Sequence, residues 1–312
     1  MTDDDAQHDG AKQRDDSSPA KSIFDVFFRI PPPLKRIFDQ TPLITYPENE
    51  PPLRTANIER NNNLLYIFTT DTEARNGRPS FNPGCLKWQT YLKFEGIPFC
   101  TVPSTNHASP SGALPFLLPA GRGQDARSAR DPIAGGKLKR WTATQKENKE
   151  KSREPEDVRY EAYASLVDHR LRRAWLYQLY LNPANHALVH RLYIAPCSSN
   201  PFVQLTIAHQ LRSSATTEIL KSNTTSAASN IVDEDEILGG AREAMEALAE
   251  LLGDNPWFFG QEKPGIFDAG LFAYTELLLD DGLGWAENRL GVMLRQSGGL
   301  VRHSDKIREV HF

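Results

Sequence analysis

The pattern of apolar and polar positions in the first half of the chain predicts a strand, a helix and two further strands. Short apolar runs rich in β-branched and aromatic residues, without a helical period, indicate strands at residues 64–69, 97–102 and 114–118. Between the first two runs, apolar side chains recur at three- and four-residue steps from Pro83 to Gly96 and indicate an amphipathic helix. This order of elements is the outline of a thioredoxin-like half-domain.

Individual residues mark the ends of these elements. Asn82 is a suitable N-cap, and Pro83 stands at the first helical position, where its missing N–H costs nothing. Pro115 opens the third strand, and the peptide bond before it is usually cis in thioredoxin-like half-domains. Gly77 and Pro79 indicate that the segment between the first strand and the helix is a loop.

The second half of the chain reads as helical. Helices are predicted at residues 160–181, 184–193, 202–221, 233–252 and 266–279, preceded by a helix that begins near residue 137. Asp268 stands three residues after Gly265, the spacing at which a carboxylate closes on the backbone amide of an N-cap. We therefore expect Asp268 to be a folding residue and not a catalytic acid. Trp257, Phe258 and Phe259 should pack under the helix that it caps.

Three segments resemble the metaxin family. NPGCLKWQTYLKFEGIPFCTVPSTNHASPSGALPFL, from residue 82, is similar to the amino-terminal domain of metaxins, and DNPWFFGQEKPGIFDAGLFAYTELLL, from residue 254, to their carboxy-terminal helical domain. PPPLKRIFDQTPLITYPENEPPL, from residue 31, resembles the leader of the fungal metaxin-like proteins. The resemblance implies an α/β thioredoxin-like N-terminal domain followed by an all-α C-terminal domain of the glutathione-S-transferase type.

Composition divides the chain into four parts. Residues 1–22 are acidic and poor in large apolar side chains, which predicts a disordered tail. Residues 23–60 form an apolar leader, in which five prolines between residues 31 and 47 prevent one long helix. The thioredoxin-like domain with a long loop follows at residues 61–155, and the helical domain at 156–312. The leader either covers the protein's own helical domain or docks on a membrane-embedded partner or a lipid surface.

Charge and cysteine content exclude several classes of protein. A net charge of −4 argues against a broadly basic nucleic-acid binder. Three cysteines without paired spacing fit a reducing compartment better than a disulfide scaffold. No apolar run approaches the ~20 residues that a membrane-spanning helix requires. The metaxin-like proteins include a larger subunit that usually ends in a membrane helix. This chain ends at Val310-His311-Phe312 without one, so it resembles the smaller, peripheral subunit.

The positions at which redox relatives carry their chemistry predict no catalytic residue here. Those relatives place a nucleophilic cysteine at the start of the helix, where this chain has Asn82. Cys85 lies one turn further and has no C-x-x-C partner for dithiol exchange. We expect Cys85 and Cys100 to be core residues, with a regulated or reactive thiol at Cys85 as the alternative.

Glutathione and metal sites are not expected either. Glutathione transferases anchor their ligand at a Glu-Ser or Gln-Ser pair, which is absent after residue 119, although three arginines there (Arg122, Arg127 and Arg130) could attract an anion. At the end of the first strand, Thr69 and Thr70 stand where an activating Tyr or Ser is expected. His186 and His190 are spaced for one helix face, but no carboxylate or thiol set completes a metal site.

The resemblance implies a non-enzymatic subunit of the mitochondrial sorting and assembly machinery, peripheral on the cytosolic face of the outer membrane. The implied partners are the membrane-embedded β-barrel insertase, a second metaxin-like subunit and β-barrel precursor proteins. Candidate partner-contacting residues are Phe24, Phe27, Phe28, Leu34, Ile37, Phe38 and His107; Asn82, Pro83, Cys85, Pro115, Gly265 and Asp268 have structural roles. A glutathione-dependent transferase or reductase, or a transferase-like scaffold in a cytosolic complex, is the alternative.

Overall fold

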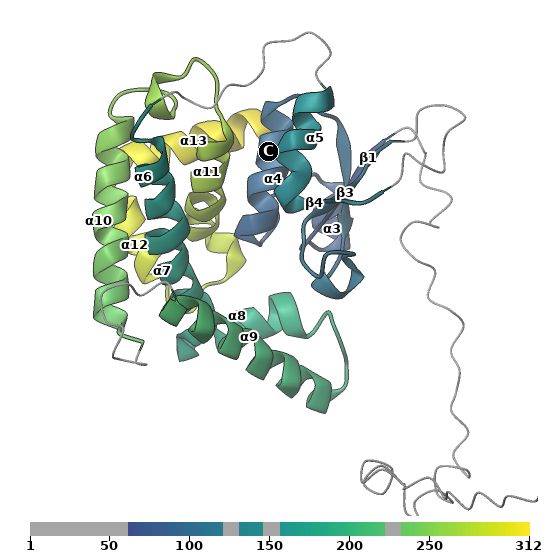
Figure 1. Ribbon diagram of the computed structural model, residues 1–312. Helices are drawn as coiled ribbons and strands as arrows, with labels where there is room; N and C mark the ends of the chain where they lie inside the picture. The colour runs from purple at the N-terminus through teal and green to yellow at the C-terminus, as the bar shows by residue number, and fades with distance from the viewer. Residues whose placement is uncertain (1–61, 121–130, 146–156, 222–231) are drawn as a thin grey trace, which may run out of the picture. The chain divides into compact units, whose positions relative to one another are not determined.

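A mixed sheet with flanking helices forms the amino-terminal part of the described chain (Figure 1). The computed structural model describes residues 62–120, 131–145, 157–221 and 232–312. Within these ranges the sheet has the order β2-β1-β3-β4, with β1 and β2 parallel and the other pairs antiparallel. The strands are β1 (Asn63–Ile67), β2 (Phe99–Pro103), β3 (Phe116–Leu118) and β4 (Ile133–Ala134). This topology confirms the predicted thioredoxin-like domain.

Several sequence predictions lie outside the described residues. They are the acidic tail at residues 1–22, the leader at 23–60 with its six candidate contact residues, and the arginines at 122, 127 and 130.

Helix α4 (Pro83–Phe94) has the ends that the sequence predicts. Asn82 is its N-cap, and its side-chain oxygen accepts a hydrogen bond from the backbone N–H of Cys85 at 3.1 Å. Gly96 follows the helix with a φ of +66°, a conformation that glycine adopts without strain. The bond between Leu114 and Pro115 is cis. The apolar face of α4 packs on the sheet together with α5 (Gly135–Gln145), burying Leu65, Ile67, Cys85, Leu92, Leu117 and Leu138.

The segment between β1 and α4, predicted to be a loop, contains the short helix α3 (Asp71–Arg75). Thr70 is its N-cap and accepts a hydrogen bond from the backbone N–H of Glu73 at 3.2 Å. A threonine followed three residues later by a glutamate is a typical start of a helix. Here it forms a helix although the glycine and prolines that follow had indicated a loop.

The prediction that Cys100 is a core residue is wrong, because its side chain is exposed. Cys100 lies on the edge strand β2 and is opposite Leu64 in the register. Residues opposite one another in a ladder point to the same face. Leu64 belongs to the face turned away from α4, so Cys100 points there too, at the edge of the sheet.

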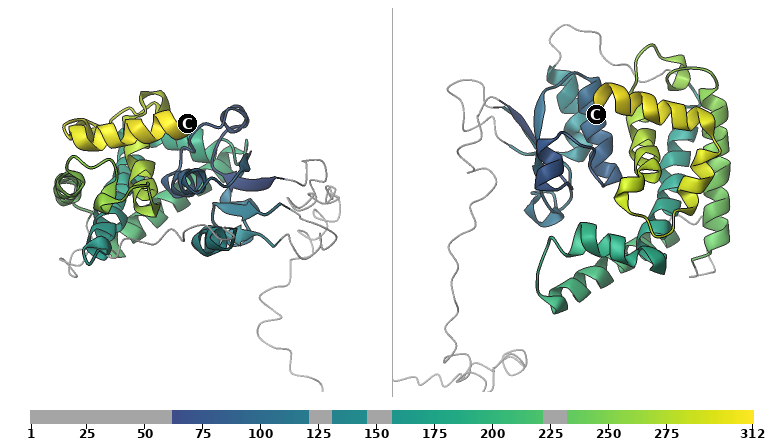
Figure 2. Two further views of the ribbon diagram at one scale, coloured as in Figure 1. Left: turned by 90° about the horizontal axis from the view of Figure 1, so that it is seen from above. Right: turned by 180° about the vertical axis from the view of Figure 1, so that it is seen from behind.

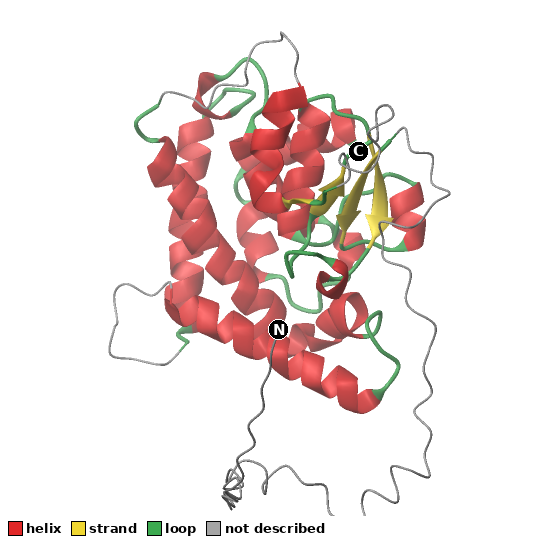
Figure 3. Cartoon of the chain, turned by 45° about the vertical axis from the view of Figure 1, so that its right-hand side comes forward, coloured by secondary structure: helices red, strands yellow, loops and turns green. Residues whose placement is uncertain are grey.

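The carboxy-terminal part of the described chain is all-helical, as predicted (Figures 2 and 3). A continuous helix from Tyr160 to Leu181 contains α-helical turns (α6, Tyr160–Ser165; α7, Arg172–Leu176) and π-helical turns (η3, Leu166–Leu171; η4, Tyr177–Leu181). The other main helices are α8 (His186–Val189), which continues into η6 (His190–Ile194), α9 (Pro201–Lys221), α10 (Glu234–Leu252), α11 (Ile266–Leu279), α12 (Arg289–Arg295) and α13 (Gly298–His311). Among the residues described, no helix combines the length and apolar character needed to cross a bilayer.

Helix α11 is the centre of this part, since every residue from Phe267 to Leu278 is buried. It packs against α4 of the thioredoxin-like domain and against α12 and α13 (Figure 1). Phe258 and Phe259 contact Phe267 at ring-centroid distances of 4.9 and 5.0 Å, so the predicted packing under the start of α11 is confirmed.

The buried carboxylate of Asp268 organises the start of α11. One oxygen accepts a hydrogen bond from the backbone N–H of Gly265 at 2.9 Å. The other accepts from the N–H of Phe258 at 3.1 Å and contacts His303 Nε2 at 2.9 Å. Gly265 contributes no side chain, so the helix is capped from the Asp268 side alone, as the sequence predicts.

Candidate functional site

The start of α4, where the sequence has Asn82 and no nucleophile, is packed with aromatic rings in this structure. Phe68, after β1, and Phe81, before α4, both contact the ring of Tyr193, with centroid distances of 5.2 and 5.4 Å. The ring centroid of Tyr180 lies 5.9 Å from that of Tyr193. Tyr193 belongs to η6, so the helical domain supplies the side chain that fills this position.

Hydrogen bonds hold Tyr193 against the helix start. Its hydroxyl donates to the backbone carbonyl of Phe81 at 3.3 Å and accepts from Asn82 Nδ2 at 3.3 Å. Burial raises the pKa of Tyr193 well above its ordinary value, which keeps the hydroxyl protonated. Tyr193 stands 111 residues from Asn82 in the sequence, so no local pattern could have indicated this contact. We name Phe68, Phe81, Tyr180 and Tyr193 the aromatic plug.

The polar side chains beside the plug bind backbone groups. Ser80 donates its hydroxyl to the carbonyl of Phe68 at 2.6 Å, and its N–H donates to Gln89 Oε1 at 2.8 Å. Gln89 Nε2 in turn donates to the carbonyl of Arg78 at 2.9 Å. Both Ser80 and Gln89 are fully buried. They fix the chain that enters α4 and do not present a nucleophile to solvent.

Cys85, the thiol nearest to the usual reactive position, is fully buried. Burial raises its pKa to about 12, and hydrogen bonds from the Phe68 backbone and Ser80 oppose this only in part. Since the thiolate is the nucleophilic form of cysteine, we expect the buried Cys85 thiol to be unreactive at neutral pH.

Thiol labelling of the native protein is therefore expected to separate the three cysteines. Exposed Cys100 should react first with an aromatic disulfide reagent. Cys197, half-buried and with a pKa raised by desolvation, should react more slowly, and Cys85 only after unfolding. Mass spectrometry of labelled peptides would identify the order, and a Cys100→Ser variant should lose the fast phase. Rapid labelling of Cys85 in the folded protein would contradict this assignment.

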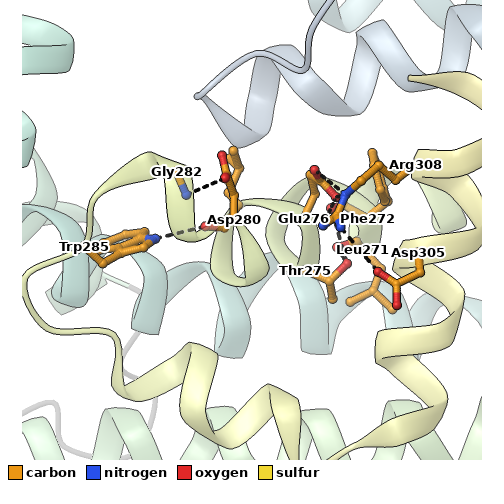
Figure 4. A network of polar contacts seen from close by, with 10 residues as sticks. Leu271, Phe272, Thr275, Glu276, Asp280, Gly282, Trp285, Asp305 and Arg308 are labelled. Carbon is orange, nitrogen blue, oxygen red and sulfur yellow. Dashed lines mark hydrogen bonds and ion pairs between the residues drawn. The ribbon is translucent and has the colours of Figure 1, made fainter.

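A second polar cluster lies towards the end of α11 (Figure 4). The carboxylate of Glu276 is buried and accepts from Arg308 Nε at 2.8 and 2.9 Å and from its Nη2 at 2.8 Å. Asp305 contacts Arg308 Nη1 at 3.4 Å. Burial raises the pKa of Glu276, and the Arg308 guanidinium opposes that shift. This cluster borders a cavity of about 520 Å³, which is also lined by Arg78 and Phe81 from the thioredoxin-like domain. Glu276 is bound by its arginine and is not a free general base.

Replacing Arg308 with alanine is expected to lower the free energy of unfolding by about 1–3 kcal/mol at neutral pH, because Glu276 would stay buried without its cation. The arginine side chain is 40% exposed, which limits the effect. The folded-state pKa of Glu276 is already raised, and the variant should raise it further. When the pKa of a carboxyl group is higher in the folded than in the unfolded protein, the folded state holds the proton more tightly. The stability that results is fully present below the unfolded-state pKa and is lost as the pH rises through the folded-state pKa. The stability that Arg308→Ala loses relative to the wild type should therefore be small in acid and should grow as the pH rises above the ordinary pKa of glutamate.

Urea unfolding at mildly acidic and mildly alkaline pH would measure this dependence. Adding Glu276→Gln to Arg308→Ala should remove the growth of the loss with pH. An equal loss of stability at both pH values would show that Arg308 acts through packing alone.

The remaining candidate residues are spread over the structure. His107 is exposed in the short 3-10 turn Asn106–Ala108 and is not one of the plug residues. Thr70 caps α3, and His190 contacts Gln204 at 3.2 Å. Among the described residues, no group of three or more His, Cys, Asp or Glu side chains could hold a metal ion.

Comparisons with known proteins agree with this architecture. A family model described as "Glutathione S-transferase N-terminal domain" matches residues 83–185, and one described as "Glutathione S-transferase, C-terminal domain" matches residues 241–307. Human Metaxin-1 is 26% identical over 242 residues, covering 76% of this chain and 49% of that protein. Metaxin-1 of Macaca fascicularis has the same identity over 242 residues, 72% of its length. The chain thus spans about half the length of the human relative.

Solved structures that match this chain include a β-etherase and a glutathione transferase. The β-etherase LigF of Sphingobium is 15% identical with a TM-score of 0.48, covering 79% of this chain and 94% of that one. A glutathione transferase of Phanerochaete chrysosporium is 12% identical with a TM-score of 0.46, covering 77% and 97% of the two chains.

Proposed function

The chain belongs to the metaxin family, and from that membership we propose that it is a non-enzymatic subunit of the mitochondrial sorting and assembly machinery. It is a peripheral protein on the cytosolic face of the outer membrane. There it binds the membrane-embedded β-barrel insertase beside a second metaxin-like subunit and helps to receive β-barrel precursors. In this role the transferase-like fold is a docking body.

The aromatic plug is the observation that supports this proposal most directly. A thiol peptide such as glutathione would need space beside the start of α4, where Phe81 and Tyr193 pack against each other at 5.4 Å. A transferase also needs a group that activates the sulfur, and Asn82 is instead bonded to Cys85 N–H and to Tyr193. The groups at this position stabilise the fold and leave none poised for thiol chemistry.

The thioredoxin-like and helical domains contact each other closely, as expected of a protein that binds its partners as one rigid unit. Beyond the α4–α11 interface, the ring of Phe312 stacks on Phe272 at 5.8 Å and lies 3.8 Å from Lys93 Nζ. The ring of His311 contacts Phe94 at 4.9 Å. The end of α13 is thereby fastened to both α4 and α11, which opposes independent movement of the domains.

Affinity purification from mitochondria in mild detergent tests the proposed function. We expect the tagged full chain to co-purify with an outer-membrane β-barrel insertase and a second metaxin-like protein, and its depletion to slow assembly of newly imported β-barrel proteins. Recovery of the chain from the cytosol alone, with neither partner, would reject the proposal.

A glutathione-dependent enzyme is the second candidate, favoured by the two transferase family models. Thermal unfolding with and without glutathione distinguishes it, since a bound ligand stabilises the folded state. We expect no shift in Tm and no retention on glutathione resin. A Tm increase that is abolished by Asn82→Ala would favour the enzyme.

The candidate contact residues stay a prediction and have their own test. Deleting residues 23–38 should abolish co-purification with the insertase if the leader docks on it, whereas His107→Ala tests the exposed loop separately. Full retention of the partner by the deletion variant, with an unchanged Tm, would exclude the leader as the docking segment.

A further inference from the structure

Exposed large apolar side chains gather at the first turn of α9. Of the residues described, Phe202 is 80% exposed, Val203 43% and Leu205 66%, whereas the other large apolar side chains with high exposure are scattered. We name Phe202, Val203 and Leu205 the α9 tip. This end of α9 follows the connection from η6, and Figure 1 shows it at the end of the α8–α9 pair remote from α10.

The α9 tip is not part of the packing that holds the helix in place. Ala215 and Ile219, three turns later, are the residues of α9 that are buried in the core. Along the exposed side, the apolar side chains give way to His209 and Arg212. The exposed apolar surface is therefore confined to the first turn of α9 and is not the continuous seam that a partner helix requires.

The segment that contains the α9 tip lacks negative charge, which suits an anionic surface. No acidic residue occurs in the sequence between Asp168 and Glu218, a segment that includes the whole of the α8–α9 connection. Arg212, beyond His209 on the exposed side of α9, is the exposed arginine of this helix. The amino-terminal end of α9, where the helix dipole is positive, lies at the same place. Carboxylates that anionic headgroups would repel are absent from this stretch of sequence.

We propose that the α9 tip inserts into the interfacial layer of an anionic lipid bilayer. Exposed apolar side chains at the end of a helix enter the boundary between headgroups and acyl chains, and the Arg212 guanidinium meets the lipid phosphates. The proposal deepens the function given above and rests on it only for the presence of a membrane. A protein partner at this surface would need a larger and flatter apolar area than three side chains provide.

Vesicle flotation of the full chain tests the proposal. Wild-type protein should float with vesicles of phosphatidylcholine and phosphatidylserine, and much less with phosphatidylcholine alone. The double variant Phe202→Asp, Leu205→Asp should bind the anionic vesicles about tenfold more weakly or worse. Val292→Asp, which changes a 59% exposed valine on α12, is the matched control and should float like the wild type. Circular dichroism would verify that the variants fold, as expected for exposed positions.

A fluorescence measurement reports the position of the tip directly. Phe202→Trp should gain emission that brominated lipids quench, whereas Val292→Trp should not. Wild-type protein that does not float, flotation of the double variant equal to that of the wild type, or absent quenching at position 202 would each overturn the proposal. Because the vesicles contain no protein, these results are independent of whether the insertase co-purifies with the chain.

Discussion

Replacing Asp268 with alanine is expected to lower the free energy of unfolding by about 3–5 kcal/mol, because a buried and a half-buried backbone N–H group and a buried histidine would lose their acceptor. The carboxylate accepts from Gly265 and Phe258 and contacts His303, and both Asp268 and His303 are almost completely buried. It joins the start of α11 to α13 and to the turn before α11. Loss of this acceptor should therefore loosen the core of the helical domain and lower the Tm.

Urea and thermal unfolding would measure the effect, with Asp281→Ala as the control. Asp281 is 91% exposed and pairs with Arg295 on the surface, so its removal should change stability by less than about 1 kcal/mol. Asp268→Asn retains one acceptor oxygen and should lose less than the alanine variant. A stability loss for Asp268→Ala no larger than that for Asp281→Ala would contradict the role assigned to this residue.

Replacing Asn185 with alanine is expected to cost about 3 kcal/mol, because its amide serves four backbone groups at a fully buried position. Its Nδ2 donates to the carbonyls of Gln178 and Glu287, both at 2.8 Å. Its Oδ1 accepts from the N–H groups of Ala286 and Glu287, both at 3.1 Å. The Asn185 side chain thus links the connection between α11 and α12, at Ala286 and Glu287, to Gln178 in the long helix that ends at Leu181.

Asn185→Asp provides a sharper test than the alanine variant. The aspartate has the same shape and can accept both N–H groups, but an ionised carboxylate cannot donate to the two carbonyls. It should destabilise the fold at neutral pH and recover in part in acid, where the carboxyl group can donate. Asn76→Ala, at an exposed C-cap, is the control and should have little effect. Wild-type stability of Asn185→Asp at neutral pH would show that the two donated bonds contribute nothing.

Much of the thioredoxin-like domain could be predicted because its signals act over a few residues. Asn82, Pro83 and Gly96 mark the ends of α4 through hydrogen bonds and backbone angles that involve only their neighbours. The cap of α11 by Asp268 follows from a three-residue spacing in the same way. The short helix α3 was missed although Thr70 and Glu73 have a capping spacing, since the glycine and prolines around it indicated a loop.

By itself, then, the sequence determined the order of β1, α4, β2 and β3, the caps of α4 and α11 and the resemblance to the metaxins, since these depend on local geometry and on the residue pattern. Only the tertiary structure decided that Tyr193 fills the start of α4, that Asn185 serves a loop 101 residues away and that Cys100 is exposed. Those outcomes depend on which distant surfaces meet, because the burial of a side chain is set by the elements that cover it and not by its neighbours along the chain.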